Sequence, residues 1–111
     1  AELYLIRAEA RAQQNNIIGA QSDLNIIRNR AGLPNTSAGN QSDLLKAVES
    51  ENRIEFFVEW GHRWFDLKRT DKADIILGIE KAPNWQTTDA LYPIPLTQIL
   101  ANPHLTQNAG Y

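Results

Sequence analysis

Apolar residues recur at helical spacing from the first residues of the chain. Leu3, Ile6 and Ala10 stand at positions i, i+3 and i+7, which lie on one face of a helix. Residues 1–14 contain many strong helix formers and neither glycine nor proline. The pattern therefore predicts a helix over residues 1–14.

A second helix is predicted over residues 17–31, after a break at Asn15 and Asn16, either of which can cap it. Its apolar stripe consists of Ile17, Ala20, Leu24, Ile27 and Ala31. Gly32 and Pro34 then stop the helix. Because so short a break joins the two helices, we expect them to pack antiparallel, as a helical hairpin.

The next predicted helix covers residues 43–60. Residues 32–42 are rich in turn formers and predict a loop, and Ser42 precedes Asp43 as an expected N-cap. Gly61 ends or kinks this helix. The larger apolar residues within it are Leu44, Leu45, Val48, Ile54, Phe56, Phe57 and Val58.

The remainder of the chain predicts short helices and irregular segments. We expect residues 62–69 to form a short helix, and residues 71–77 either to extend it or to form a separate turn. Three of the five prolines fall within residues 79–95, which we expect to be irregular or extended, and residues 96–101 can form one more helical turn. The fold class is thus all-α, with long irregular C-terminal loops.

Domain organisation follows from these elements. We expect a single domain over residues 1–111, composed of the hairpin at 1–31, the helices at 43–77 and the irregular closing segment at 78–111.

Composition excludes several classes of protein. The 111 residues carry 11 Lys and Arg against 13 Asp and Glu, which lacks the positive charge of a nucleic-acid-binding protein. There is no cysteine, so a disulfide scaffold or a thiolate metal site is excluded within these residues. The longest unbroken apolar run is residues 3–6, so we expect the chain to be soluble, with no signal peptide or membrane anchor of its own.

The densest charged pattern lies in residues 51–69. Glu51, Glu55 and Glu59 are spaced four residues apart, and Arg63 extends the row by one turn if the helix continues past Gly61. We expect Glu55, Glu59, Arg63 and Asp66 to form a structural ion-pair network beside the aromatic residues.

A catalytic interpretation of the same segment would pair Glu55 and Glu59 with His62 as acid and base. It is disfavoured because neighbours on one helix surface cannot easily flank a substrate from two sides. A metal site is disfavoured too, since Glu-x-x-His occurs once, at Glu59 to His62, and His104 is remote in sequence. We expect no catalytic residue, no metal and no cofactor.

Aromatic residues raise the possibility of carbohydrate binding through their flat faces. Trp60, Trp64 and Phe65 lie in apolar helical patterns and are expected in the core. Trp85 follows Pro83 and Asn84 in a loop, where we expect it to be exposed, and Tyr92 lies in the proline-rich segment. Trp85 and Tyr92 are therefore the candidate ligand-binding residues.

Three stretches of the sequence resemble the SusD/RagB family, in the same order along the chain. Residues 23–33 read DLNIIRNRAGL, similar to the family's DLNxIRxRAGL, and residues 55–69 contain the signature EWGHRWFDLKR. Residues 91–95 read LYPIP, and residues 102–111 carry NP followed by TQNAGY, similar to the family's closing segment. The departures are Asn52, where a basic residue is more usual, and Ala109, where proline is common.

The resemblance covers the C-terminal part of that family and implies a function. SusD-like proteins are nutrient-binding lipoproteins on the outer membrane of Bacteroidetes, which deliver oligosaccharides to a SusC-like TonB-dependent transporter. Their fold implies a tetratricopeptide-like (TPR-like) hairpin at residues 1–31 and a structural role for the signature residues. We expect a non-catalytic glycan-binding protein whose lipid anchor lies outside these residues. The alternative is a stand-alone TPR-like module for protein interaction.

Overall fold

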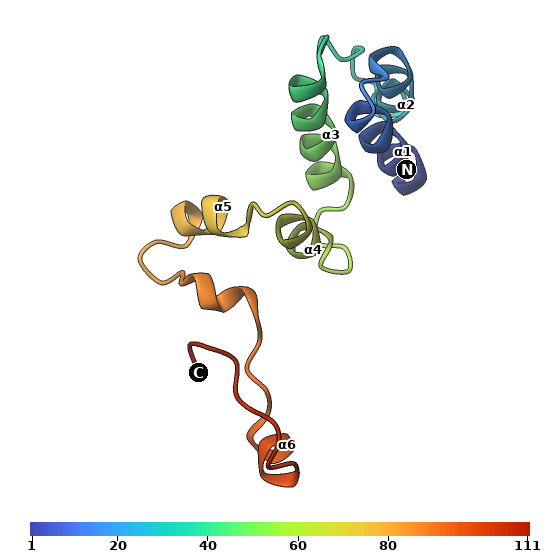
Figure 1. The fold of residues 1–111 in the computed structure, drawn as a ribbon. Helices are drawn as coiled ribbons and strands as arrows, with labels where there is room; N and C mark the ends of the chain where they lie inside the picture. The colour runs from blue at the N-terminus through green and yellow to red at the C-terminus, as the bar shows by residue number, and fades with distance from the viewer. The chain divides into compact units, whose positions relative to one another are not determined.

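The computed structural model describes residues 1–111, and its regular elements are all helices, joined by irregular segments, with no β-strand (Figure 1). The predicted all-α class is therefore confirmed. Two compact units divide the chain, Ala1–Arg63 and Trp64–Tyr111, and each is described by itself. The expectation of a single domain over 1–111 stays a prediction. In order, the helices are α1 Glu2–Gln13, α2 Ile17–Arg30, α3 Gln41–Glu55, α4 His62–Arg69, α5 Ala73–Glu80, the 3₁₀-helix η1 Thr87–Ala90, and α6 Leu96–Ala101.

Helices α1 and α2 form the predicted antiparallel hairpin (Figure 1). Arg7 of α1 reaches Asp23 of α2, and Arg11, one turn later in α1, reaches Gly19, one turn earlier in α2. This register can arise only if the helices run in opposite directions. Asn16 caps α2, because its side-chain oxygen accepts the Gly19 N–H at 3.0 Å.

The core of the first unit lies between α1, α2 and α3. Its buried residues are Leu5, Ala8, Ala12, Ala20, Leu24, Ile27, Leu44 and Val48. On α1 the buried face is not the predicted stripe, since Leu3 is 82% exposed and Ile6 and Ala10 are also exposed. Small side chains at Ala8 and Ala12 give α1 a second apolar face, along which neighbouring helices can approach closely.

Helix α3 ends at Glu55, five residues earlier than predicted, and Asn40 rather than Ser42 caps its start by accepting the Asp43 N–H at 2.9 Å. Residues 56–61 form a turn in which Val58 and Trp60 adopt positive φ angles of 63° and 47°. Such angles are incompatible with a continuing right-handed helix. Glu59 consequently lies outside α3, and the predicted row of three glutamates on one helix face is wrong.

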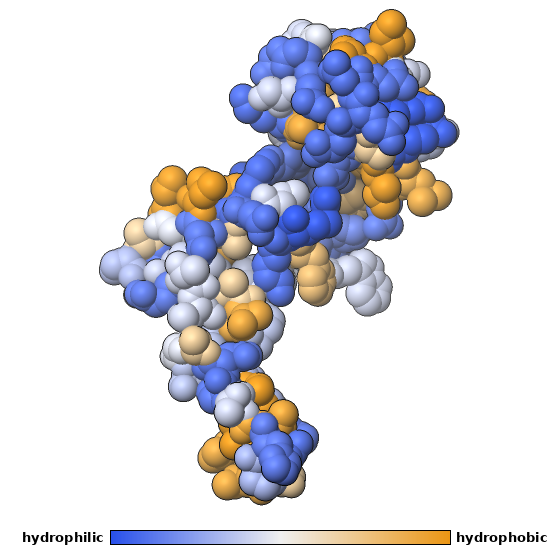
Figure 2. All heavy atoms as spheres, viewed as in Figure 1, coloured by the Kyte–Doolittle hydropathy of each residue, from blue (hydrophilic) through white to orange (hydrophobic).

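The second unit contains most of α4 together with α5, η1 and α6. Residues 71–77 do not extend α4, because Asp71 adopts a positive φ of 54° and α5 begins separately at Ala73. The buried core here consists of Leu67, Ala73 and Leu77. Figure 2 shows apolar side chains at the surface over α5 and α6, where Ile79 and Leu100 are among the exposed residues.

Side-chain hydrogen bonds fasten the C-terminal tail to the proline-rich segment. Gln107 accepts the Ile94 N–H at 2.7 Å and donates to the Ile94 carbonyl at 2.9 Å. Ile94 stands between Pro93 and Pro95, which have no N–H to donate, so a regular backbone ladder cannot form there. A carboxamide side chain takes its place. We call the contacts of residues 107–111 with residues 88–94 the C-terminal clasp.

Two further contacts complete the clasp. Asn108 donates to the Tyr92 carbonyl at 2.7 Å, and the Tyr111 hydroxyl donates to the Leu91 carbonyl at 3.1 Å. Gly110 has a φ of 99° and passes so close to Thr88 that a Cβ atom on it would lie 2.5 Å from the threonine Oγ1. Glycine is therefore required at position 110 for both reasons.

Candidate functional site

Three aromatic rings from separate elements meet in the second unit. The ring of Trp64, on α4, lies 6.1 Å from that of Trp85 and 6.2 Å from that of Tyr92, centroid to centroid. Both pairs are edge-to-face, with interplanar angles of 75° and 65°, which is a preferred geometry for aromatic pairs. We call these three residues the aromatic cluster. It contains both predicted ligand-binding residues.

Trp85 is less exposed than predicted. Its indole packs against the small core of the second unit, and its Nε1–H donates to a carboxylate oxygen of Asp74 at 2.8 Å. The loop is still a surface loop, but α5 supplies both an apolar wall and a hydrogen-bond acceptor for the ring. Nothing in the loop's own residues indicates that Asp74, which lies 11 residues earlier, accepts this hydrogen bond.

Tyr92 is the exposed member of the cluster, with 72% of its surface accessible. Its backbone carbonyl is held by the Asn108 side chain, so the clasp fixes the segment from which the ring projects. Trp64 is only partly exposed, as the core expectation implied, and its Nε1–H is buried without a hydrogen-bond acceptor. The cluster thus combines an anchored interior with an exposed edge at Tyr92.

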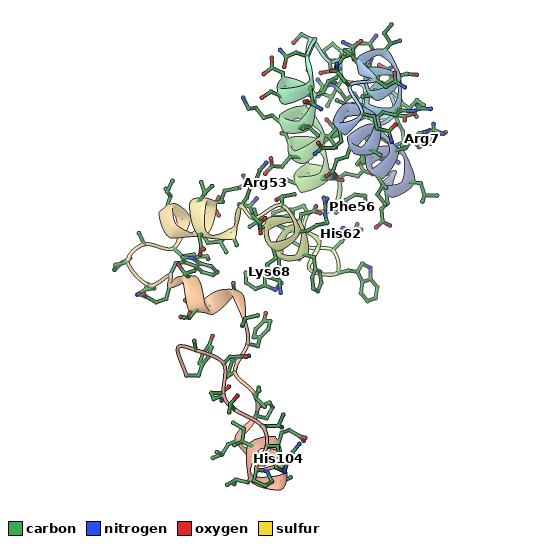
Figure 3. All side chains as sticks on the ribbon, in the orientation of Figure 1. Arg7, Arg53, Phe56, His62, Lys68 and His104 are labelled. Atoms are coloured by element: carbon green, nitrogen blue, oxygen red, sulfur yellow. The ribbon has the colours of Figure 1, made fainter.

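Lys68 joins the cluster one helical turn after Trp64. Its ammonium nitrogen lies 4.8 Å from the centroid of the Trp64 ring and 5.8 Å from that of Phe65 (Figure 3 labels Lys68 on α4). Sequence reasoning missed this residue, although the spacing of four from Trp64 places the two side chains together on a helix.

Two aromatic residues expected in the core are exposed instead. Phe65 is 61% exposed and Trp60 is 89% exposed. Phe65 points away from the small core that Leu67 and Trp64 contact, and Trp60 lies in the turn at residues 56–61, outside any helix. For Trp60, the apolar pattern that predicted burial continues past the end of α3, where the helical period no longer applies. Phe65 stands two residues before Leu67 on α4, which directs the two side chains to different sides of that helix.

The four predicted network residues make the following contacts. Glu55 pairs with Arg30 of α2, and Asp66 pairs with Arg69 at 3.0 Å within α4. Glu59 lies in the turn, where its backbone N–H donates to the Phe56 carbonyl and its carbonyl accepts the His62 N–H. Arg63, in the first turn of α4, is half-buried. A single network joining all four residues stays a prediction.

The hairpin contains a buried carboxylate, Asp23, that the sequence analysis did not identify. Asp23 is 1% exposed and accepts hydrogen bonds from Arg7 at 2.7 and 2.9 Å and from Arg11 at 2.7 Å. The Arg7 hydrogen bonds, together with the positive charges of both arginines, hold the pKa of the Asp23 carboxyl below its usual value despite burial. The available signal was an aspartate between Ala20 and Leu24 on the buried stripe, opposite two arginines one turn apart.

The two histidines occupy different environments. His62 stacks on Phe56, with 4.5 Å between ring centroids and 20° between planes, and its Nε2 lies 3.7 Å from a carboxylate oxygen of Glu2 (Figure 3). His104 is exposed in the tail. No group of three or more His, Asp or Glu residues has the arrangement needed to hold a metal ion. None of the helices combines the length and apolar content that crossing a bilayer requires.

Comparison with known proteins gives consistent matches over the whole chain. Residues 1–111 match the SusD family. The chain is 32% identical to SusD-like protein P38 of Formosa agariphila over 121 residues, which cover 100% of this chain and 23% of that protein. It is 33% identical to SusD-like protein P2 of the same organism over 128 residues, covering 100% of this chain and 25% of that protein.

A solved structure shows the same fold. A SusD-like protein from Bacteroides fragilis matches with a TM-score of 0.79 and 29% identity, covering 99% of this chain and 24% of that one. The chain therefore spans about a quarter of the length of the relatives it matches. On the family match over residues 1–111 and the two relatives above 30% identity, the chain belongs to the SusD family.

Proposed function

We propose that this chain is the non-catalytic, oligosaccharide-binding segment of a nutrient-uptake protein, and that the aromatic cluster contacts the ligand through Tyr92 and Trp85. The observation that carries the proposal is the cluster itself: an exposed tyrosine is held in place by two half-buried tryptophans and by the clasp. Sugar rings present C–H faces that pack on aromatic surfaces, while the surrounding polar groups satisfy their hydroxyls.

The cellular setting of the proposal follows from membership of the SusD family. The chain would act at the outer membrane, as part of a surface lipoprotein that delivers its ligand to a SusC-like TonB-dependent transporter. A gene for such a transporter beside the gene for this chain is the expected finding. Its absence would argue against the uptake role while leaving saccharide binding open to direct test.

Substitution of the cluster tests ligand binding directly. Isothermal titration against a panel of oligosaccharides should show that Tyr92→Ala binds about tenfold more weakly than the original chain, because it removes the exposed aromatic surface. Trp85→Ala should weaken binding as well, since it also removes a wall of the cluster.

Trp60→Ala is the matched control. It removes an aromatic side chain that is larger and more exposed than that of Tyr92 from the turn at residues 56–61, outside the cluster. Binding should be unchanged in this variant. Equal loss in Trp60→Ala and Tyr92→Ala, or undiminished binding in Tyr92→Ala, would contradict the proposed site. Circular dichroism verifies that each variant keeps its helical content.

A further inference from the structure

The last turn of α4 carries two neighbouring cations in different electrostatic situations. Arg69 is paired with Asp66 at 3.0 Å, so its charge is balanced by a carboxylate on its own helix. The ammonium of Lys68 instead lies over the rings of Trp64 and Phe65, and no carboxylate pairs with it. One cation is therefore balanced within the chain and its neighbour is not.

The aromatic contacts place the Lys68 ammonium without using up its hydrogen-bonding capacity. Ring faces attract a cation through their negative electrostatic potential and restrain the flexible lysine side chain. They are weak acceptors, however, and an ammonium carries three N–H donors. The amine therefore keeps donors for oxygen atoms of an anionic group.

Exposed aromatic side chains belong to the same group of rings as this cation. Phe65 is largely exposed, and Tyr92, also exposed, contacts the same Trp64 ring over which Lys68 lies. Two carboxylates of this unit already have partners, because Asp66 pairs with Arg69 and Asp74 accepts the Trp85 indole N–H. A ligand with a flat apolar face and an adjacent negative charge would match this arrangement, whereas a neutral ligand would gain little from the unbalanced cation.

We propose that Lys68 makes the aromatic cluster selective for acidic saccharides, whose carboxylate or sulfate group it binds while Tyr92 packs on the sugar ring. This inference rests on the proposed function and names the ligand class of the same site. Lys68 is then a specificity-determining residue, and the aromatic surface supplies the contact that acidic and neutral saccharides share.

The experiment uses paired ligands that share one sugar backbone, with the anionic group present in one member and esterified or removed in the other. Oligogalacturonate is compared with its methyl ester, and a sulfated galactan oligosaccharide with its desulfated form, by titration calorimetry at low ionic strength. The original chain should bind at least one acidic member about tenfold more tightly than its neutral counterpart, which is the size expected of one charge-assisted contact. The two pairs distinguish a carboxylate from a sulfate as the recognised anion.

Two variants then assign the preference to one residue. Lys68→Gln should reduce the preference to about twofold or less, because it weakens binding of the acidic member more than binding of the neutral member. Arg69→Gln, which removes the same charge from the adjacent position, should retain it. The preference of the original chain should also fall as salt is added, because exposed charges are screened.

The outcomes separate the two proposals. Equal binding of acidic and neutral members, or a preference that survives in Lys68→Gln, would overturn the role of Lys68 and leave the saccharide-binding function standing. An equal loss of preference in Lys68→Gln and Arg69→Gln would show that net charge alone is responsible, and would also overturn it. Binding to no member of a broad saccharide panel would overturn the proposed function and this inference together.

Discussion

Different interactions stabilise each of the two units of this chain. The first, residues 1–63, buries eight apolar residues in one cluster between three helices, and adds a buried aspartate clamped by two arginines. The second, residues 64–111, buries three apolar residues and relies on aromatic pairs and on side-chain hydrogen bonds to the backbone. The contrast shows two ways of ordering a chain, one by area buried and one by specific polar contacts.

The sequence accounts for the difference. Long helices with wide apolar faces can stack and remove much surface from water, which is the dominant favourable contribution to folding. A segment with prolines at positions 83, 93 and 95 cannot form such helices and leaves backbone groups to be satisfied individually. The side chains of Gln107 and Asn108 perform that task at Ile94 and Tyr92.

The largest expected effect comes from truncating the first core. Leu24 is fully buried in the first unit, whereas Leu77 is 9% exposed at the edge of the smaller core. Leu24→Ala should lower the free energy of unfolding by about 3–5 kcal/mol, and Leu77→Ala by about 2 kcal/mol, since the cost rises with the cavity left behind. Hydrogen exchange read by mass spectrometry reports each unit separately. Equal losses at the two positions would remove the contrast between the cores.

Loss of the buried carboxylate should rank next. Asp23→Asn removes the charge that Arg7 and Arg11 bind, and breaking a buried ion pair in this way costs about 3 kcal/mol. Asp43→Asn is the control, because its pair with Lys46 is exposed, has a separation of 3.9 Å, and should contribute less than about 0.5 kcal/mol. Urea unfolding at pH 7 measures both. Similar midpoints for the two variants would mean that the Asp23 clamp contributes no more than a surface pair.

The same carboxylate should make the unfolding free energy of the first unit depend on pH. Because its pKa is lowered in the folded state, the stabilisation is fully present above the unfolded pKa of about 4 and is lost as the pH falls through the folded value. The difference in unfolding free energy between the original chain and Asp23→Asn should therefore be constant from pH 5 to 8. It should shrink below about pH 4. A difference that stays constant down to pH 2 would contradict the assignment.

Much of the fold could be predicted from the sequence, because local signals and tertiary packing agree in the hairpin. The predicted hairpin helices differ from α1 and α2 by about one residue at their ends, and the short helix at 62–69 is confirmed. The end of α3 could not be predicted from the sequence. Apolar residues continue through Phe57 and Val58 in a pattern compatible with a helix, and only the positive φ angles at Val58 and Trp60 reveal a turn.

The candidate site was predictable in its members but not in its geometry. Trp85 and Tyr92 were identified by residue type and by their irregular surroundings, yet nothing local indicated that both would contact Trp64. The acceptor at Asp74 and the support from Asn108 come from residues 11 and 16 positions away along the chain. Such contacts depend on how short segments fold over one another, which hydrophobic periodicity does not encode.

The smallest expected effect is that of Gln107→Ala, a substitution that tests whether polar contacts order the second unit. Gln107→Ala removes both hydrogen bonds to Ile94, whose neighbours Pro93 and Pro95 offer no replacement donors. The substitution also removes the acceptor of the Asn108 N–H, which lies 2.9 Å from the Gln107 side-chain oxygen. The expected loss is about 1–2 kcal/mol, the size expected for a few modest hydrogen bonds at the surface. Gln98→Ala is the control, since Gln98 is exposed on α6 and its side chain makes no such contact.

The sharpest measurement is the exchange rate of the Ile94 amide hydrogen, which should rise markedly in Gln107→Ala and remain unchanged in Gln98→Ala. Global unfolding alone is less informative, because the first unit would dominate the signal. If the Ile94 amide exchanges rapidly in the original chain as well, the clasp does not order this segment in solution. The second unit would then depend on its small apolar core and aromatic cluster alone, and the support that Asn108 gives to Tyr92 would have to be tested in the same way.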